Sequence, residues 1–293
     1  ISEGDAATLV TLNETTNAYT ITVTDSSVSA ANLITLDGLT SVAVAVNSTT
    51  LTGSCSDVTS VYNANTAGTI SGLGDEAVTL SDTTLAAADL NTLNGLTTGV
   101  VNAGTVTTLT GTAAAANTAY DADTAGTISG LGDEAVTLTD TTLAASVLNT
   151  LNGNTTGVVN AGTVTTLTGA YSALKTAYDA DTAGTISGLG DEAVTLSDTT
   201  LAVANLNTLN GLTTGVVNAG TVTTLTGAYS ALKTAYDADT AGTISGLGDE
   251  AITLSDTTLA AADLNTLNGL TTGVVNAGTV TTLTGTAAAA NTA

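Results

Sequence analysis

The chain has 293 residues, of which 26 are Asp or Glu and only two are Lys, with no Arg or His, so the formal net charge is −24. Two Lys cannot neutralise a phosphate backbone, which excludes nucleic acid as a partner, and the same charge excludes anionic membrane surfaces. The lack of His and Arg removes the residues on which most acid–base and phosphoryl-transfer chemistry depends, whereas 43% hydrophobic residues suffice for a folded core.

The first 24 residues differ from the rest of the chain. Ile1–Leu12 (ISEGDAATLVTL) loosely echoes a later motif, ISGLGDEAVTL, and the NETT that follows is expected to form a turn. In NAYTITVT, Tyr19, Ile21 and Val23 alternate with Thr, a pattern typical of a half-buried strand. We expect residues 1–24 to be an N-terminal β cap, either a hairpin or a diverged first coil, because stacked repeats need an atypical terminal unit.

A 58-residue repeat dominates the remaining chain. The string TISGLGDEA recurs with its Ile at positions 70, 128, 186 and 244. Such self-similarity predicts a solenoid, in which each unit buries its apolar face against its neighbours. We assign residues 25–293 to this repeat solenoid, with modules at approximately 21–77, 78–135, 136–193, 194–251 and a partial module at 252–293.

Each module divides into two related halves, which begin at Val78 and Val106 in the second module. Short β-branched runs at 78–80, 100–103 and 105–109 predict strands. Apolar residues spaced at i, i+4 and i+7 predict a helix after the first strand, with Asp82 or the next Thr as its N-cap and Gly95 as its end. The predicted core positions are Val78, Leu80, Leu85, Leu90, Leu93, Val101, Val106, Leu109 and Ile128, together with their copies.

The predicted fold is an α/β solenoid of stacked strand–helix coils of about 28–30 residues, with parallel strands between coils. Adjacent strands lie ~4.8 Å apart, whereas packed helices need about 8–10 Å. Because of this mismatch, we expect the stack to be curved or twisted.

The carboxylates are the candidate binding groups, because oxygen-rich loops with Gly suit Ca²⁺. The alternative interpretation is that Asp82, Asp140, Asp198 and Asp256 are N-caps and that the other carboxylates are solvated turn residues. Ca²⁺ is therefore a candidate ligand rather than an assigned cofactor. The candidate metal ligands are Asp121, Asp123, Asp133, Glu134, Asp179, Asp181, Asp191, Glu192, Asp237, Asp239, Asp249 and Glu250.

Three other positions are interpreted structurally. Asn102 and its copies in VVNAG are expected to satisfy turn backbone groups. Cys55 aligns with Ala113, Tyr171 and Tyr229, a range of volumes that predicts a position at the edge of the packing. We expect its thiol to be an inert filler, with a reactive thiol as the alternative.

The motifs DTTLAAADLNTLNGLTTGVVNAGTVTTLTG and GLGDEAVTLSDTT resemble the repeat regions of very long extracellular bacterial proteins, notably cyanobacterial surface or adhesin-like proteins, which are often associated with hemolysin-type calcium-binding repeats. The resemblance covers roughly residues 20–293 and implies secretion and a structural or adhesive role. The tandem glycine-rich nonapeptides of calcium-binding repeats are absent from this sequence.

These observations predict a non-enzymatic extracellular or cell-surface structural protein that forms a filament, surface layer or matrix by repeat stacking. The acidic groups of the repeated motifs are copied from module to module, whereas a catalytic centre would require one unique constellation. Because the last predicted helix stops at Ala293 without a cap, we expect head-to-tail self-association or a longer natural chain. The alternative is a Ca²⁺-dependent adhesin segment that binds a glycan or protein ligand.

Overall fold

The computed structural model describes residues 3–12 and 18–293, and the NETT turn expected at residues 13–16 lies outside them. The fold is an α/β solenoid of strand–helix coils with parallel strand ladders. The chain forms two compact units, Ile1–Thr139 with Leu151–Asn160 (unit 1) and Asp140–Thr150 with Ala161–Ala293 (unit 2).

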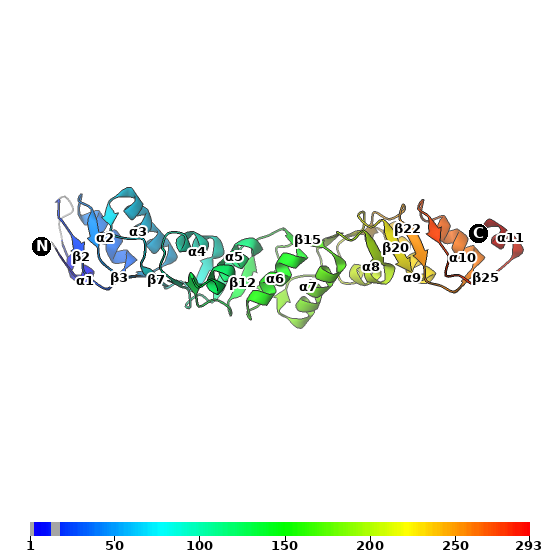
Figure 1. The fold of residues 1–293 in the computed structure, drawn as a ribbon, viewed down its shortest axis with the longest axis horizontal. Helices are drawn as coiled ribbons and strands as arrows, with labels where there is room; N and C mark the ends of the chain where they lie inside the picture. The colour runs from blue at the N-terminus through cyan, green and yellow to red at the C-terminus, as the bar shows by residue number, and fades with distance from the viewer. Residues whose placement is uncertain (1–2, 13–17) are drawn as a thin grey trace. The chain divides into compact units, whose positions relative to one another are not determined.

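Unit 1 contains the first coils of the solenoid. Its helices α2, α3, α4 and α5 follow one another in chain order, and α2 packs on α3, α3 on α4 and α4 on α5 (Figure 1). Its elements are β1 (Glu3–Gly4), α1 (Ala6–Leu9), β2 (Thr22–Val23), β3 (Ser27–Ser29), α2 (Ala30–Leu39), β4 (Val44–Val46), β5 (Thr50–Gly53), α3 (Cys55–Ala67), β6 (Ile70–Ser71), β7 (Ala77–Leu80), β8 (Thr84–Ala86), α4 (Ala87–Asn94), β9 (Val101–Asn102), β10 (Thr108–Gly111), α5 (Ala113–Thr124), β11 (Ile128–Ser129), β12 (Ala135–Leu138) and β14 (Val159–Asn160). Helix α6 (Ala145–Asn154) contributes residues to both units.

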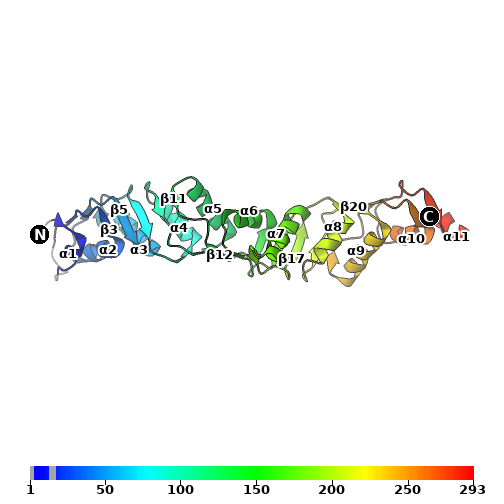
Figure 2. The same ribbon diagram turned by 90° about the horizontal axis from the view of Figure 1, so that it is seen from below.

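Unit 2 repeats this arrangement, with α7, α8, α9 and α10 again packed in succession (Figure 2). Its elements are β13 (Thr142–Ala144), β15 (Thr166–Gly169), α7 (Tyr171–Ala183), β16 (Ile186–Ser187), β17 (Ala193–Leu196), β18 (Thr200–Ala202), α8 (Val203–Asn210), β19 (Val217–Asn218), β20 (Thr224–Gly227), α9 (Tyr229–Ala241), β21 (Ile244–Ser245), β22 (Ala251–Leu254), β23 (Thr258–Ala260), α10 (Ala261–Asn268), β24 (Val275–Asn276), β25 (Thr282–Thr284) and α11 (Ala287–Thr292).

The strands form parallel ladders that take every second strand of the chain. In unit 1 one ladder runs β3–β5–β7–β9–β11, and in unit 2 the corresponding ladder runs β13–β15–β17–β19–β21. The register of the second ladder stacks one apolar residue from each strand, and these five residues are 0–6% exposed. They are Leu143, Leu167, Val194, Val217 and Ile244.

The strand pairing also shifts relative to the repeat from one coil to the next, which we call stepping. Successive partners in the unit 2 ladder lie 24, 27, 23 and 27 residues apart, always fewer than the 29 residues that make up half of a module. The ladders therefore shift relative to the repeat. Among the described residues, the four ladders that end at β6, β11, β16 and β21 end at an Ile-Ser strand, while a new ladder begins in every module at a strand such as β8 or β18. Because of this stepping, no ladder has to stay level with the wider-spaced helices over the whole stack.

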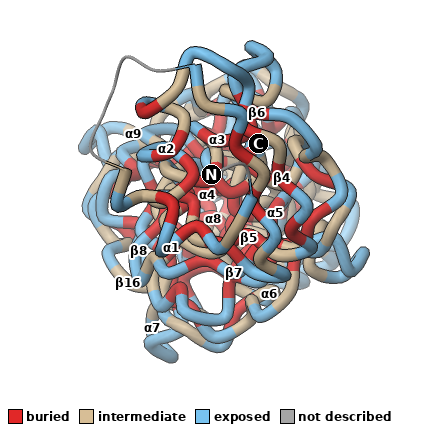
Figure 3. Tube along the Cα trace, turned by 90° about the vertical axis from the view of Figure 1, so that its left-hand side faces the viewer, coloured by how far each residue is buried: buried red, intermediate tan, exposed pale blue. Residues whose placement is uncertain are grey.

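The interior is apolar, and buried residues line the inside of the coils (red in Figure 3). The predicted core is confirmed for the second module, where all nine named positions are at most 6% exposed, whereas in the partial last module the copy Leu283 is 43% exposed. Two local predictions were wrong. The strand expected at 105–109 begins only at Thr108, because the Val106 N–H donates to the Ala103 carbonyl in a turn. The N-cap of α4 is Ala86, since β8 separates Asp82 from the helix.

The N-terminal segment has the same strand pairing and helix contact as the later coils. Strands β1 and β2 pair in parallel, with α1 between them, whereas a hairpin would pair them antiparallel. The Asp25 carboxylate accepts a 2.7 Å hydrogen bond from the Ala6 N–H at the start of α1. The same contact joins later coils, so this segment is built as a coil.

Candidate functional site

The most regular polar feature of the interior is a network of one Tyr, one Glu and one Thr, which we call the Tyr–Glu–Thr network. In the first copy, the Tyr62 hydroxyl on α3 donates to the Glu76 carboxylate at 3.2 Å, and that carboxylate also accepts the Gly74 N–H at 2.8 Å. The Thr97 hydroxyl from the next coil donates to the Glu76 carbonyl at 2.7 Å and accepts the Gly99 N–H. Three elements of successive coils thus meet at one buried glutamate.

The network returns once in each complete module. Its glutamates are 0–1% exposed and its tyrosines 3–5% exposed. The later copies are Tyr120–Glu134–Thr155, Tyr178–Glu192–Thr213 and Tyr236–Glu250–Thr271.

Electrostatics inside the network follow from its burial. Loss of solvation raises the pKa of Glu192, although hydrogen bonds from Gly190 and Tyr178 oppose the shift. Burial likewise raises the pKa of Tyr178 well above its usual range, and the charge of Glu192 adds to this effect. The tyrosine therefore stays protonated and acts as a permanent donor to the carboxylate.

A glycine allows the coils to approach at this point. A Cβ placed on Gly99 would lie 2.2 Å from the Glu76 carbonyl oxygen, and the same contact recurs at Gly157, where the distance to the Glu134 carbonyl oxygen would be 2.3 Å. Any side chain here would push two coils apart.

Two further sets of hydrogen bonds join neighbouring coils. The Asp82 carboxylate accepts the Cys55 N–H at 2.8 Å, so it caps the helix of the preceding coil rather than the helix that follows it. The Asp198 carboxylate does the same for the Tyr171 N–H at 2.7 Å. The Asn91 side-chain amide donates to the Ala115 carbonyl on the next helix at 2.9 Å.

The threonine-rich strands also hold neighbouring coils together. The Thr107 hydroxyl donates to the Thr83 carbonyl at 3.1 Å, and the Thr105 hydroxyl donates to the Leu80 carbonyl at 3.0 Å. These hydroxyls therefore satisfy backbone groups of the coil before them. The Asn102 side chain, as expected, accepts a turn N–H, that of Gly104 at 2.9 Å.

The twelve candidate metal ligands fall into four environments. The first Asp of each YDAD motif is exposed, the second accepts a backbone N–H at 3.2 Å, the Asp of each GLGDE motif is exposed, and its Glu is buried in the Tyr–Glu–Thr network. These environments are occupied by Asp121, Asp179 and Asp237; Asp123, Asp181 and Asp239; Asp133, Asp191 and Asp249; and Glu134, Glu192 and Glu250. Within residues 3–12 and 18–293, no three acidic or thiol side chains gather where they could hold a metal ion, so the calcium prediction gains no support from the geometry.

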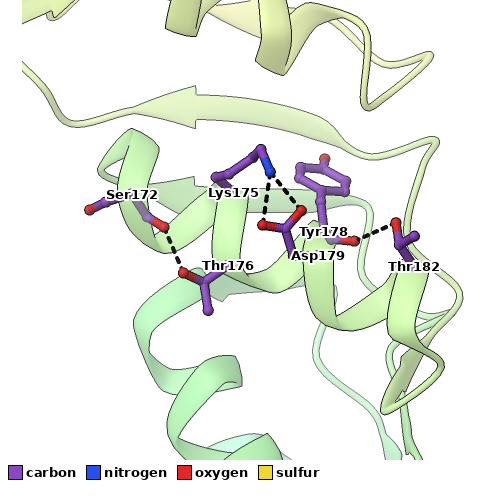
Figure 4. A network of polar contacts seen from close by, with 6 residues as sticks. All are labelled: Ser172, Lys175, Thr176, Tyr178, Asp179 and Thr182. Carbon is purple, nitrogen blue, oxygen red and sulfur yellow. Dashed lines mark hydrogen bonds and ion pairs between the residues drawn. The ribbon is translucent and has the colours of Figure 1, made fainter.

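Both Lys residues pair with an Asp on their own helix. In α7 the Lys175 Nζ lies 2.6 and 2.8 Å from the two Asp179 oxygens, as drawn in Figure 4, where Thr176 and Thr182 donate to carbonyls one turn back. Lys233 and Asp237 repeat the pair in α9. Hydrogen bonding to Asp179 raises the pKa of Lys175. Both pairs are solvent-exposed, so we assign them little structural weight.

Sequence reasoning named Glu134, Glu192 and Glu250 only as candidate metal ligands and missed their burial, because an acidic residue in a Gly-rich motif is usually exposed. A usable signal was present, since every one of these Glu residues follows a Tyr by 14 positions. No helix in the described part of the chain is long and apolar enough to cross a lipid bilayer. Comparisons with family models, curated proteins and solved structures found no match to this chain.

Proposed function

We propose that this protein is a non-enzymatic structural component of an extracellular or cell-surface material, in which stacked coils form the scaffold. The observation that carries the proposal is the repetition of the same interior contacts in every module. The Tyr–Glu–Thr network, the Asp82-type cap and the Asn91-type bond each join one coil to the next, and each recurs at the module period.

The polar groups support a scaffold better than a catalyst. A catalytic centre needs one constellation of groups aimed at a substrate. Here the buried carboxylates are copied from module to module, and each accepts hydrogen bonds from its own Gly and Tyr. These hydrogen bonds tie each carboxylate to the protein around it, which is the role that a scaffold requires. The extracellular location rests on the resemblance of the repeat motifs and on the strong negative charge.

Self-association is part of the proposal, and the ladders supply a means for it. Leu283 on β25 is 43% exposed, whereas its copies Leu225 and Leu167 are 0% exposed beneath the following coil. Val274 is likewise 76% exposed, compared with 42% for Val216. Further coils of a longer chain, or a second copy, would bury these residues and extend the parallel ladders; we propose that a second copy stacks in head-to-tail fashion, a contact that propagates rather than closes.

Sedimentation velocity and electron microscopy over a range of concentrations test this function. We expect assemblies that grow with concentration in the wild type, and Leu283→Lys should weaken association at least about tenfold by placing a charge in the contact. Val100→Lys is the matched control, because Val100 is an exposed valine within an interior module. A wild type that remains a single small species up to roughly 100 µM, near the weak end of specific association, would contradict the proposal.

A further inference from the structure

A groove of about 450 Å³ opens in unit 1 beside the first turns of α3 and α4. Its walls include Cys55 and Thr59 from α3, Asp82 and Leu85 from the strand segment, and Asp89 and Thr92 from α4. The volume lies in the range of small-molecule sites. The lining thus combines apolar residues, such as Leu85, with two acidic residues, Asp82 and Asp89.

The repeats show what fills the corresponding place elsewhere. Cys55 is the first residue of α3, and its copy Tyr229 is the first residue of α9. The two backbones are held alike, because the Cys55 N–H donates to Asp82 at 2.8 Å and the Tyr229 N–H donates to Asp256 at 2.7 Å. The copy in unit 2 therefore carries a phenol ring where unit 1 has only a thiol.

That phenol has a polar partner. Burial raises the pKa of Tyr229, and the negative charge of the neighbouring Asp263 adds to this, with Asp263 and Thr266 both close enough to the phenol to affect it. Asp263 and Thr266 are the copies of Asp89 and Thr92, which line the groove. Unit 1 thus retains the acceptor for a phenolic hydroxyl but lacks the ring.

The type of the residue 34 positions after each copy of Cys55 changes with whether that copy is a tyrosine. Where the copy of Cys55 is Tyr171 or Tyr229, the residue 34 positions later is polar, Asn205 or Asp263. Where the copy is Ala113, that residue is Val147. The Cys55 copy alone combines a small residue with an Asp, which leaves an unfilled space beside a carboxylate.

We propose that this groove binds a small phenol, whose hydroxyl donates to Asp89 and whose ring lies against Leu85, in the place that tyrosine occupies in unit 2. The nearby Asp82 and Asp89 favour phenols with neutral or cationic substituents and disfavour anionic ones. The site does not depend on the self-association proposed above, since Cys55 and its neighbours are remote in sequence from Leu283, although the Cys55 N–H and Asp82 also form one of the contacts between coils.

The ligand 4-methylphenol tests the site directly, because it is the tyrosine side chain as a free molecule. We expect it to bind the wild-type chain with a dissociation constant in the range of about 0.1–10 mM, the level that eight heavy atoms support. Tyramine, which adds a cation, should bind more tightly, whereas toluene, which lacks the hydroxyl, and 4-hydroxybenzoate, which is anionic, should each bind at least about tenfold more weakly. Binding is measured by ligand-observed NMR and calorimetry.

Three variants locate the ligand. Cys55→Tyr should abolish binding by filling the groove, and Asp89→Val should weaken it about tenfold or more. The matched control Asp121→Val, at an exposed Asp of α5 outside the groove lining, should leave binding within a factor of about two. Circular dichroism checks that each variant folds, and should Cys55→Tyr fail to fold, Asp89→Val and its control Asp121→Val still locate the site. Absence of binding to the wild type, equal affinity for toluene, or undiminished affinity in a folded Asp89→Val or Cys55→Tyr variant would overturn the assignment.

Discussion

Replacing Tyr120 with Phe removes one hydroxyl from the interior and leaves the ring in place. That hydroxyl donates to Glu134 at 3.1 Å, and the same carboxylate oxygen keeps the Gly132 N–H at 2.9 Å. The other Glu134 oxygen is buried without a partner, so the carboxylate has no spare donor to replace the one lost. Hydrogen bonds to charged groups contribute about 1.5–3 kcal/mol. We therefore expect Tyr120→Phe to lower the unfolding free energy of the surrounding coils by about 2–3 kcal/mol.

Urea unfolding followed by circular dichroism gives the global change, and hydrogen exchange in residues 113–138 gives the local one, because stacked repeats open unit by unit. Tyr171→Phe is the control, since Tyr171 is only half-buried, and it should change stability by less than about 0.5 kcal/mol. In a double-mutant cycle with Glu134→Gln, the coupling should be about 1–2 kcal/mol. A loss for Tyr120→Phe no larger than that of the control would refute the reasoning.

Other expected outcomes concern the remaining contacts between coils. Asn91→Ala should cost about 0.5–1 kcal/mol by urea unfolding, because it removes the bond to Ala115, whereas the exposed Asn102→Ala should cost less; equal losses would argue against a cross-coil role. Gly157→Ala should destabilise the fold by more than about 3 kcal/mol, since its Cβ would lie 2.3 Å from the Glu134 carbonyl oxygen. Gly153→Ala on α6, which has open space around it, should instead stabilise the fold by about 0.5–1 kcal/mol. Similar melting temperatures for the two variants would contradict the close approach at Gly157. Burial raises the folded-state pKa of Glu192 above its ordinary value of 4.5, so the folded chain binds more protons there and stability should rise as the pH falls from 7 toward 4.5. Thermal melts at pH 7 and pH 5 should show a smaller rise in Glu192→Gln, and identical slopes would exclude this contribution.

The repeat period and the apolar spacing were enough to predict the solenoid and its core. Leu90 and Leu93 were placed on the buried helix face by their spacing alone, and both are 0% exposed. The period states that copies are equivalent, and the shortness of each copy requires that neighbours share a core. Both inferences depend only on the repeat period and on the spacing of apolar residues, which can be read directly from the sequence.

Pairing between coils could not be predicted in the same way. Strand β8 was missed because Thr84–Ala86 lies between an Asp-Thr-Thr turn and an Ala-rich helix, and only its pairing with Thr108–Thr110 makes it a strand. The role of Asp82 was assigned to the wrong helix for the same reason, since its partner, Cys55, is brought near by stacking. Both errors concern contacts more than 20 residues apart in the chain, which local patterns do not specify.

The stepping of the ladders bears on how such a chain can change in length. Because a fresh ladder starts at the same point of every module, excising or duplicating 58 residues would rejoin matching ends and keep each hydrogen-bonding partnership intact. Removing a single coil would instead place a two-residue Val-Asn strand where the ladder has a four-residue strand. The Gly and Glu that approach each other in adjacent turns would then no longer align. Changes of length by whole periods would thus preserve the fold, in keeping with modules that are nearly identical over their full length while the halves within them differ.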